Sequence, residues 1–206
     1  MSQGLDELLR LGGTLPLLPA CDHFYFLRHG QTARNVQRIF QAPDEPLNDT
    51  GLEQARRAAE LLAGEPIRTI VCSDAQRALT TALTVAAQHA VEPVPDDGLR
   101  ERNFGVLIGT SSAQIDWACD PADGESLSVF MGRKHSALAR ALALPGPVLV
   151  VAHGGSLFAL AAMLGVPVDM KLLGNAQPLR FARSGATWSV EPLMQQQAVD
   201  GGAALA

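Results

Sequence analysis

Apolar runs alternate with segments of helical periodicity along most of the chain. The apolar runs at 23–28, 68–73, 146–153, 178–183 and 186–191 predict strands, and the periodic segments at 50–64, 75–90, 126–143 and 156–164 predict helices. The run "GPVLVVAH" (146–153) is continuously apolar, which is typical of a central strand covered on both faces. The pattern predicts an α/β fold, a three-layer sandwich in which helices cover both faces of a mostly parallel central sheet.

Turn and capping signals outline the domain organisation. Thr50 and Glu53 have the spacing of a capping box, so we expect the first helix to begin at Thr50. The 206 residues are enough for one sizeable domain, which we place at 21–195. The alternation of strands and helices is interrupted over about 105–125, before the helix at 126–143 and the strand that ends at His153. We expect a small lid there and call residues 105–125 the lid segment.

The two ends of the chain do not continue the pattern. Residues 1–20 are rich in leucine but also contain acidic residues, glycines and prolines, so we expect an N-terminal extension on the domain surface and no signal peptide. The small polar residues 196–206 are expected to form a flexible tail. No apolar run approaches the ~20 residues that a membrane-spanning helix needs.

The composition of the chain limits the classes of molecule that we expect it to bind. The chain is 47% hydrophobic and 18% charged, with a formal net charge of −5 and no basic block, which argues against binding to nucleic acid or a membrane surface. Its three cysteines are widely spaced, so neither a disulfide framework nor a metal site is indicated, and we expect a cytoplasmic location. No cofactor motif is present, and the oligomeric state is left open.

Polar residues follow three of the predicted strands. Arg28 and His29 end the first strand, Arg77 lies one helical turn beyond the second, and His153 ends the strand at 146–153. Because the carboxyl ends of parallel strands meet at one edge of a sheet, we expect these side chains to lie close together. Two guanidinium groups and a histidine suit the oxygens of a phosphoryl group.

Neighbouring residues complete a phosphate pocket. Asn35 offers an amide donor, and Gly154 lets the backbone approach a bound group at the start of a helix, where the N-terminus favours anions. His29 is the candidate nucleophile, because nearby guanidinium groups keep its ring neutral and the carbonyl of Gly30 can fix its tautomer. Glu101, in "LRERNFG", is the candidate general acid.

Each of these residues also has a purely structural interpretation. An Arg-His pair after a strand commonly marks a polar turn at which the chain leaves the core. A lone glutamate in a loop is commonly solvated, and a strand-end histidine such as His153 can simply be hydrogen-bonded. Because all of these residues occur together in one chain, we favour a phosphate site over the structural interpretations. The other histidines, together with one arginine, have no such context, and we interpret them as surface residues: His23, His89, His135 and Arg102.

Five ordered segments resemble the motifs of the histidine phosphatase superfamily, in its phosphoglycerate mutase-like branch. They are "LRHGQTARN" (27–35), "PLNDTGLEQA" (46–55), "CSDAQRALTTA" (72–82), "LRERNFG" (99–105) with "DGES" (123–126), and "VAHGG" (151–155). The resemblance covers most of 23–191. It implies that His29 carries the phosphoryl group, Arg77 binds it, Glu101 is the acid and His153 is the second histidine. Thr32 belongs to the first motif and is assigned with Asn35 to substrate binding.

The departures from the family pattern fall where the rest of the substrate should lie. Arg34 stands where many members have tryptophan, and we expect it to add one positive charge at the mouth of the site. Leu107 and Ile108 replace a Trp and a Glu that are common in the family, and with Ile115 and Trp117 they should make the lid side apolar. Small phosphate monoesters with a partly apolar leaving group should therefore suit the site better than bisphosphates.

These features predict a metal-independent and cofactor-independent phosphatase that hydrolyses a small phosphorylated metabolite through a phosphohistidine on His29. A phosphoglycerate mutase-type transfer is the first alternative, because it uses the same groups. Little chain, essentially 110–123, is available between Glu101 and His153 to close the site against water, which favours hydrolysis. An inactive phosphate-binding module is the second alternative.

Overall fold

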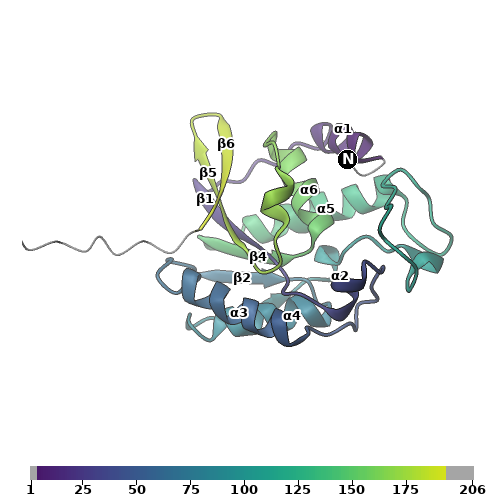
Figure 1. Ribbon diagram of the computed structural model, residues 1–206. Coiled ribbons are helices and arrows are strands. Elements are labelled where there is room, and N and C mark those ends of the chain that lie inside the picture. The colour runs from purple at the N-terminus through teal and green to yellow at the C-terminus, as the bar shows by residue number, and fades with distance from the viewer. Residues whose placement is uncertain (1–3, 194–206) are drawn as a thin grey trace, which may run out of the picture.

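The computed structural model describes residues 4–193, so the predicted tail at 196–206 lies outside the described residues. Within this range a single six-stranded sheet has the order β3-β2-β4-β1-β5-β6 (Figure 1). Its strands are β1 (His23–Arg28), β2 (Thr69–Cys72), β3 (Val94–Pro95), β4 (Val148–Ala152), β5 (Pro178–Ser184) and β6 (Thr187–Pro192). The first four strands run parallel, while β5 and β6 are antiparallel additions at one edge.

Alternate residues of the central strands pack against different helical layers. Phe24 and Phe26 of β1 face one core, whereas Tyr25 and Leu27 face the other. The first core is covered by α1 (Leu5–Gly13), α5 (Leu127–Leu142) and α6 (Gly154–Leu164), and the second by α3 (Asp49–Leu62) and α4 (Gln76–Ala86) (Figure 1). All five residues of β4 are buried. The predicted three-layer sandwich is confirmed.

Several element boundaries differ from the prediction. The N-cap of α3 is Asn48 and not Thr50, because the Asn48 side chain accepts a hydrogen bond of 2.8 Å from the backbone N–H of Gly51. The helix predicted over 75–90 ends at Ala86, and α6 begins at Gly154 instead of residue 156. Five short pieces were not predicted: β3, the helix α2 (Ala33–Gln37) and the 3₁₀ turns Asp97–Leu99, Gly105–Leu107 and Met170–Leu173.

The N-terminal segment contributes to the core, although we expected it on the surface. Leu5, Leu8 and Leu17 are buried, and Leu8 is fully so. Helix α1 packs along α6, where Gly12 lies so close to Ala162 that it has no room for a Cβ. Leucines at helical spacing thus cover one face of α6 with an apolar stripe.

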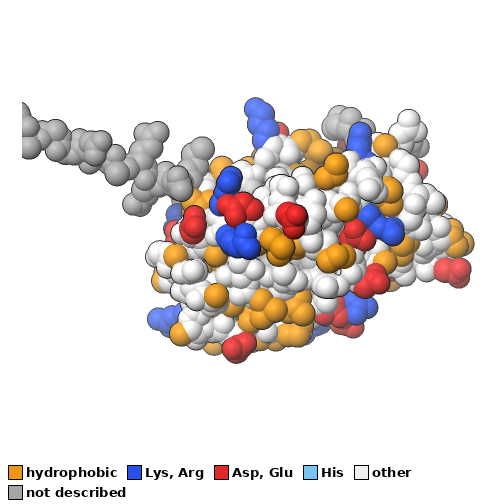
Figure 2. Space-filling model, turned by 60° about the horizontal axis from the view of Figure 1, so that its bottom comes forward, with side chains coloured by type: hydrophobic (Ala, Val, Ile, Leu, Met, Phe, Trp, Pro, Cys, Tyr) orange, Lys and Arg blue, Asp and Glu red, His pale blue; other side chains and the backbone are white. Residues whose placement is uncertain are grey.

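Surface composition follows the sequence. Acidic and basic side chains are interspersed over the face shown in Figure 2. None of the helices within 4–193 combines the length and the apolar character needed to cross a membrane. The three cysteines Cys21, Cys72 and Cys119 are free, as their spacing predicts.

Candidate active site

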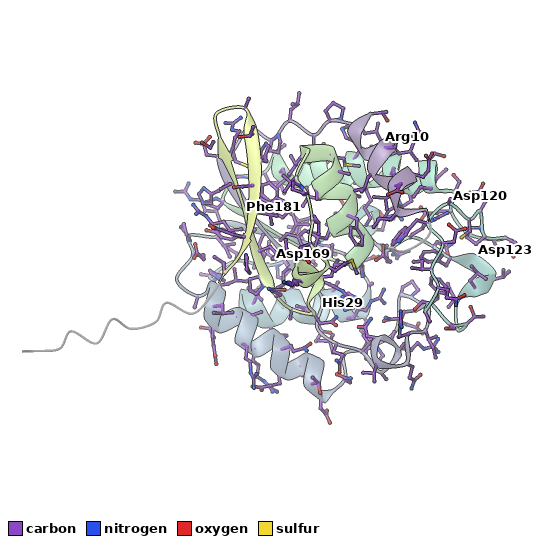
Figure 3. The ribbon with its side chains drawn as sticks, turned by 45° about the horizontal axis from the view of Figure 1, so that its top comes forward. Arg10, His29, Asp120, Asp123, Asp169 and Phe181 are labelled. Carbon is purple, nitrogen blue, oxygen red and sulfur yellow. The ribbon has the colours of Figure 1, made fainter. Side chains whose placement is uncertain are left out.

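The carboxyl ends of β1, β2 and β4 bring the predicted polar groups to one edge of the sheet. The backbone N–H of His29 continues the β1–β4 ladder by donating to the carbonyl of Ala152. The backbone N–H of Ser73 continues the β2–β4 ladder by donating to the carbonyl of Val151. A cavity of about 290 Å³ opens at this edge. Its lining includes the predicted residues Arg28, His29, Asn35, Arg77, Glu101, His153 and Gly154. The side chain of His29 can be followed in Figure 3.

The ring of His29 is held as a neutral imidazole with one free nitrogen. Its Nδ1 lies 2.7 Å from the carbonyl oxygen of Gly30, which fixes the proton on Nδ1 and leaves the lone pair on Nε2. Burial, followed by the charges of Arg77 and Arg28, holds the pKa of His29 well below its ordinary value. His29 is only 3% exposed. A neutral ring with an unprotonated Nε2 is the form that can attack phosphorus.

The turn that carries His29 is held by one hydrogen bond to a side chain and by one close approach between backbones. The backbone N–H of Gly30 donates to Oγ1 of Thr81, a residue of the "RALTT" segment on α4. A Cβ on Gly30 would meet the backbone of Gly51, at the start of α3. The glycines of the first two motifs therefore let the loop after β1 lie directly against α3.

His153 presents a second neutral ring to the same cavity. Its Nε2 lies 2.9 Å from Oγ of Ser73, and that oxygen also accepts the backbone N–H of Ala75. The Ser73 hydroxyl can therefore donate to Nε2, which places the ring proton on Nδ1. This Nδ1 is buried and has no hydrogen-bond partner within residues 4–193. Burial is the main cause that lowers the pKa of His153, and the charge of Arg77 comes next.

Two arginines supply permanent positive charge. Arg28 donates from Nη1 to the carbonyl of Leu173 at 2.5 Å, whereas its Nε is buried and has no partner in the part of the chain that the structure describes. Arg77 donates from Nη1 to the carbonyl of Ala42 at 2.9 Å and from Nε to Nε2 of His29 at 3.3 Å. Burial lowers the pKa of Arg77 to about 10, so this side chain is still cationic near pH 7. Unpartnered donors on Arg28 and His153 indicate a site for an anion.

Thr32 and Asn35 cap the short helix α2 reciprocally. Oγ1 of Thr32 accepts from the backbone N–H of Asn35 at 3.0 Å, and Oδ1 of Asn35 accepts from the backbone N–H of Thr32 at 3.1 Å. The hydroxyl of Thr32 is buried and donates to Gln41, so Thr32 supports the loop. The amide nitrogen of Asn35, which lines the cavity, is left to donate.

Glu101 links the turn after β3 to the start of α6. Its Oε1 accepts from the backbone N–H of Arg102 at 3.0 Å, and its Oε2 accepts from the backbone N–H of Gly155 at 2.8 Å. A Cβ on Gly155 would collide with this carboxyl group and with the ring of Trp117. These two hydrogen bonds fix the orientation of the Glu101 side chain, which lines the same cavity as the histidines and arginines.

Comparison of the sequence with known protein families is consistent with the geometry of the site. Residues 24–191 match the family model of the histidine phosphatase superfamily (branch 1). The chain belongs to this superfamily. A glucosyl-3-phosphoglycerate phosphatase of Mycolicibacterium vanbaalenii is 35% identical over 184 residues, which cover 76% of this chain and 82% of the relative. A probable phosphoglycerate mutase GpmB of Yersinia pestis is 33% identical over 167 residues, covering 69% and 75%.

One curated relative is much longer than the region it shares. An agropine synthesis reductase of Rhizobium rhizogenes is 34% identical over 179 residues, covering 82% of this chain but 41% of the relative. The chain thus spans less than half the length of that protein. Among solved structures, a mycobacterial glucosyl-3-phosphoglycerate phosphatase superposes with a TM-score of 0.70 at 29% identity, covering 84% of this chain and 98% of the other.

In this histidine phosphatase superfamily member, α5 holds the turn that carries Glu101. Arg133 donates from Nη1 to the carbonyl of Gly98 at 2.8 Å and from Nη2 to the carbonyl of Glu101 at 3.3 Å. The Nζ of Lys134 donates to the carbonyl of Arg100. Lys134 is fully buried, and burial lowers the pKa of its ammonium group well below the ordinary value. We did not predict a role for this residue, although its i,i+4 spacing from the apolar Phe130 places it on the buried face of the helix.

The positive charge at the mouth comes from an arginine other than the one we expected. Arg34 pairs with Glu45, at 3.0 Å from Nε to Oε2, and is not among the residues that line the cavity. Arg38 instead brings the positive charge to the mouth, and its Nη2 donates to the carbonyl of Ala113 at 3.1 Å. Arg38 follows the short helix α2 with a positive φ, a turn that the hydrophobic pattern does not reveal.

Arg102 is buried, whereas the sequence suggested a surface residue. It is 3% exposed, and its guanidinium donates to the carbonyl of Trp117 at 2.6 Å, to that of Glu125 and to that of Cys119. Trp117 and Cys119 lie within the lid segment, and Glu125 is at its end. Arg102 therefore fastens the lid segment to the turn that carries Glu101.

The lid segment contributes only part of the predicted apolar lining. Ile115 and Trp117 line the cavity, whereas Leu107 packs against the core and Ile108 lines a neighbouring cavity of about 230 Å³. Asp120 and Asp123 lie on the outer side of the lid segment, away from His29 (Figure 3). The 3₁₀ turn Met170–Leu173 lies on the other side of the cavity, to which it contributes Met170 and Leu173.

Proposed function

We propose that this protein is a phosphatase that hydrolyses small phosphate monoesters through a phosphohistidine on His29. One observation carries the proposal: the neutral ring of His29 has its free Nε2 at the floor of a cavity whose buried donors on Arg28 and His153 have no partner among the described residues. A dianionic phosphoryl group satisfies those donors and places phosphorus next to the nucleophile.

The first half-reaction transfers the phosphoryl group to the enzyme. Nε2 of His29 attacks phosphorus in line with the ester oxygen, the P–N bond forms and the P–O bond to the leaving group breaks. The electron pair of the broken bond stays on the leaving oxygen, which takes a proton from the carboxyl group of Glu101. Arg28, Arg77 and the other donors of the floor hold the non-bridging oxygens.

The second half-reaction returns the enzyme to its starting state. The carboxylate of Glu101 takes a proton from a water molecule, whose oxygen attacks phosphorus as the P–N bond breaks. The electron pair returns to Nε2 of His29, inorganic phosphate leaves, and Glu101 is again protonated. Both half-reactions use one acid and one nucleophile, so we expect no metal requirement and no effect of a chelator on the rate.

Hydrolysis is favoured over mutase activity by the length of the lid segment. A mutase has to hold the phosphorylated enzyme and the alcohol together while excluding water. The lid segment is short, and the cavity that it borders reaches the surface at Arg38 and at the exposed side chain of Met170. An inactive module is disfavoured because nucleophile, acid and phosphate-binding groups are all in place.

Covalent labelling tests the proposal. Brief exposure to a ³²P-labelled ester should leave acid-labile, base-stable phosphate on His29, and His29→Gln should lower turnover by roughly 10⁴-fold or more. His135→Gln, at a half-buried position of α5 that does not line the catalytic cavity, is the matched control. Full turnover by His29→Gln would exclude the mechanism, and interconversion of 2- and 3-phosphoglycerate faster than phosphate release would replace hydrolysis with mutase activity.

A further inference from the structure

Four aromatic rings from four separate segments form one wall of the catalytic cavity. Phe40 follows α2, Phe104 follows the turn of Glu101, Trp117 belongs to the lid segment and Phe158 lies on α6. The ring centroids of Phe40 and Phe104 are 4.3 Å apart, those of Phe104 and Trp117 5.9 Å, and those of Trp117 and Phe158 6.4 Å. The rings thus form a continuous surface, called the aromatic wall below.

The aromatic wall is preformed. Phe104, Trp117 and Phe158 are all buried, and the ring of Trp117 also packs against Phe130 of the core. The carbonyl of Trp117 is fixed by Arg102, as described above. Rings that are packed in this way keep their orientation, so a ligand that lies against them needs little rearrangement of the protein.

The remaining part of the cavity, outside the phosphate-binding floor, is also mostly apolar. Ile39, Ile115, Met170 and Leu173 supply apolar side chains there, and Gln41 and Ser112 add two uncharged polar ones. Arg38 is the charged residue of the described lining that is not part of the catalytic group, and it already donates to Ala113. A carboxylate or second phosphate in this space would lose its hydration and gain few partners, which is unfavourable.

From this lining we propose that the leaving group is an alcohol that carries a planar aromatic ring, and that the ring lies against the aromatic wall. This inference rests on the proposed phosphatase function and names its substrate class. Offset-stacked and edge-to-face contacts between rings favour such a group beyond the burial of its area. The cavity volume of about 290 Å³ suits one ring and a short linker next to a phosphoryl group.

Esters of alcohols with similar reactivity test the substrate class. Ethyl phosphate, 2-phenylethyl phosphate and glycerol 3-phosphate all have alkyl leaving groups, so differences in kcat/KM report mainly on binding of the leaving group. Burial of a phenyl group should raise kcat/KM for the 2-phenylethyl ester roughly 10- to 100-fold above that for the ethyl ester. Glycerol 3-phosphate should show no comparable gain.

Substitutions in the cavity lining test whether the preference for the 2-phenylethyl ester arises at the aromatic wall. Phe40→Ser and Ile115→Ser should each lower the ratio of kcat/KM between the 2-phenylethyl and ethyl esters at least several-fold. Val129→Ser removes an exposed apolar side chain on α5, outside the cavity, and should leave this ratio unchanged. An equal loss of the ratio in Val129→Ser would show that the effect does not come from the wall.

Phosphonates separate this inference from the proposed function, because they bind without being hydrolysed. Calorimetry should show that 2-phenylethylphosphonate binds roughly 10- to 100-fold more tightly than ethylphosphonate. If no ester is hydrolysed but this preference is present, the phosphatase assignment fails and the aromatic wall stands. If esters are hydrolysed through His29 but neither kcat/KM nor binding favours the phenyl group, the inference about the wall is wrong.

Discussion

The Nε–H of Arg77 donates a hydrogen bond of 3.3 Å to Nε2 of His29, the nitrogen that attacks phosphorus in the proposed mechanism. The two groups cannot both use this geometry when a phosphoryl group is bound, because Nε2 then points at phosphorus. Arg77 therefore has two effects on His29. Its charge disfavours the protonated ring, and its guanidinium is close enough to bind the oxygens of the group that Nε2 attacks.

Replacing Arg77 tests both effects. Arg77→Ala should lower kcat/KM by roughly 10- to 150-fold, the range for loss of one charge-assisted hydrogen bond. The same change should raise the pKa of His29, because the largest charge effect on that ring is removed. Imidazole NMR titration measures the pKa. Arg77→Lys keeps the charge but loses the planar fork, so it should restore the low pKa more than the rate. An unchanged pKa of His29 in Arg77→Ala would contradict this.

The role of Glu101 is tested by the leaving group. Glu101→Gln cannot transfer a proton, so alkyl esters, which need protonation of the leaving oxygen, should lose roughly 10²- to 10⁴-fold in kcat. Aryl esters with acidic phenols need little protonation and should lose much less. Glu53→Gln on α3 is a control for loss of a surface carboxylate. Equal losses for alkyl and aryl esters would reduce Glu101 to a residue that only positions the turn.

Residues at strand ends were predictable because a local pattern determines their place. Arg28, His29 and His153 follow apolar runs, and the parallel order of the strands brings their ends together. Arg77 follows a strand by one helical turn. These positions need only the periodicity of the chain, whereas Glu101 was proposed as the acid from its loop "LRERNFG", and the family resemblance implied the same role. The carboxyl group of Glu101 is placed by contact with α6, which no local pattern encodes.

Residues whose position depends on the lid segment were not predictable. Arg102 is buried only because the lid segment, which has no regular periodicity, folds back so that its carbonyls meet the guanidinium. The aromatic wall combines Phe40 and Phe158, which are far apart in the sequence, through the same folding. Arg34 was assigned to the mouth from its motif position alone, and an ion pair with Glu45 directs it elsewhere.

The buried histidines should make stability depend on pH. The pKa values of His29 and His153 in the folded protein lie well below 6.5, the value of an unfolded histidine. Below pH 6.5 the unfolded chain takes up protons that the folded protein does not, so the free energy of unfolding decreases as the pH falls toward the folded-state pKa. Each ring contributes at most about 1.4 kcal/mol per pH unit, and almost nothing above about pH 7.5.

Urea unfolding at pH 7.5 and pH 5.5 measures this decrease. His153→Gln should show a smaller decrease between the two pH values than the wild-type protein, because one of the two rings that must stay neutral is gone. His135→Gln controls for the loss of any histidine. An identical decrease in the wild type and in His153→Gln would show that His153 does not cause the dependence.

The last prediction concerns the attachment of the lid segment. Arg102→Met keeps an unbranched side chain but leaves the carbonyls of Trp117, Cys119 and Glu125 without their donor, so we expect the free energy of unfolding to fall by about 3 kcal/mol. The emission of Trp117, measured in a Trp188→Phe background, should shift to the red as the lid segment loosens. Arg140→Met removes an exposed ion pair with Asp96 and should cost less than about 1 kcal/mol. If Arg102→Met were no more destabilising than Arg140→Met and left the emission of Trp117 unchanged, Arg102 would not be what fastens the lid segment.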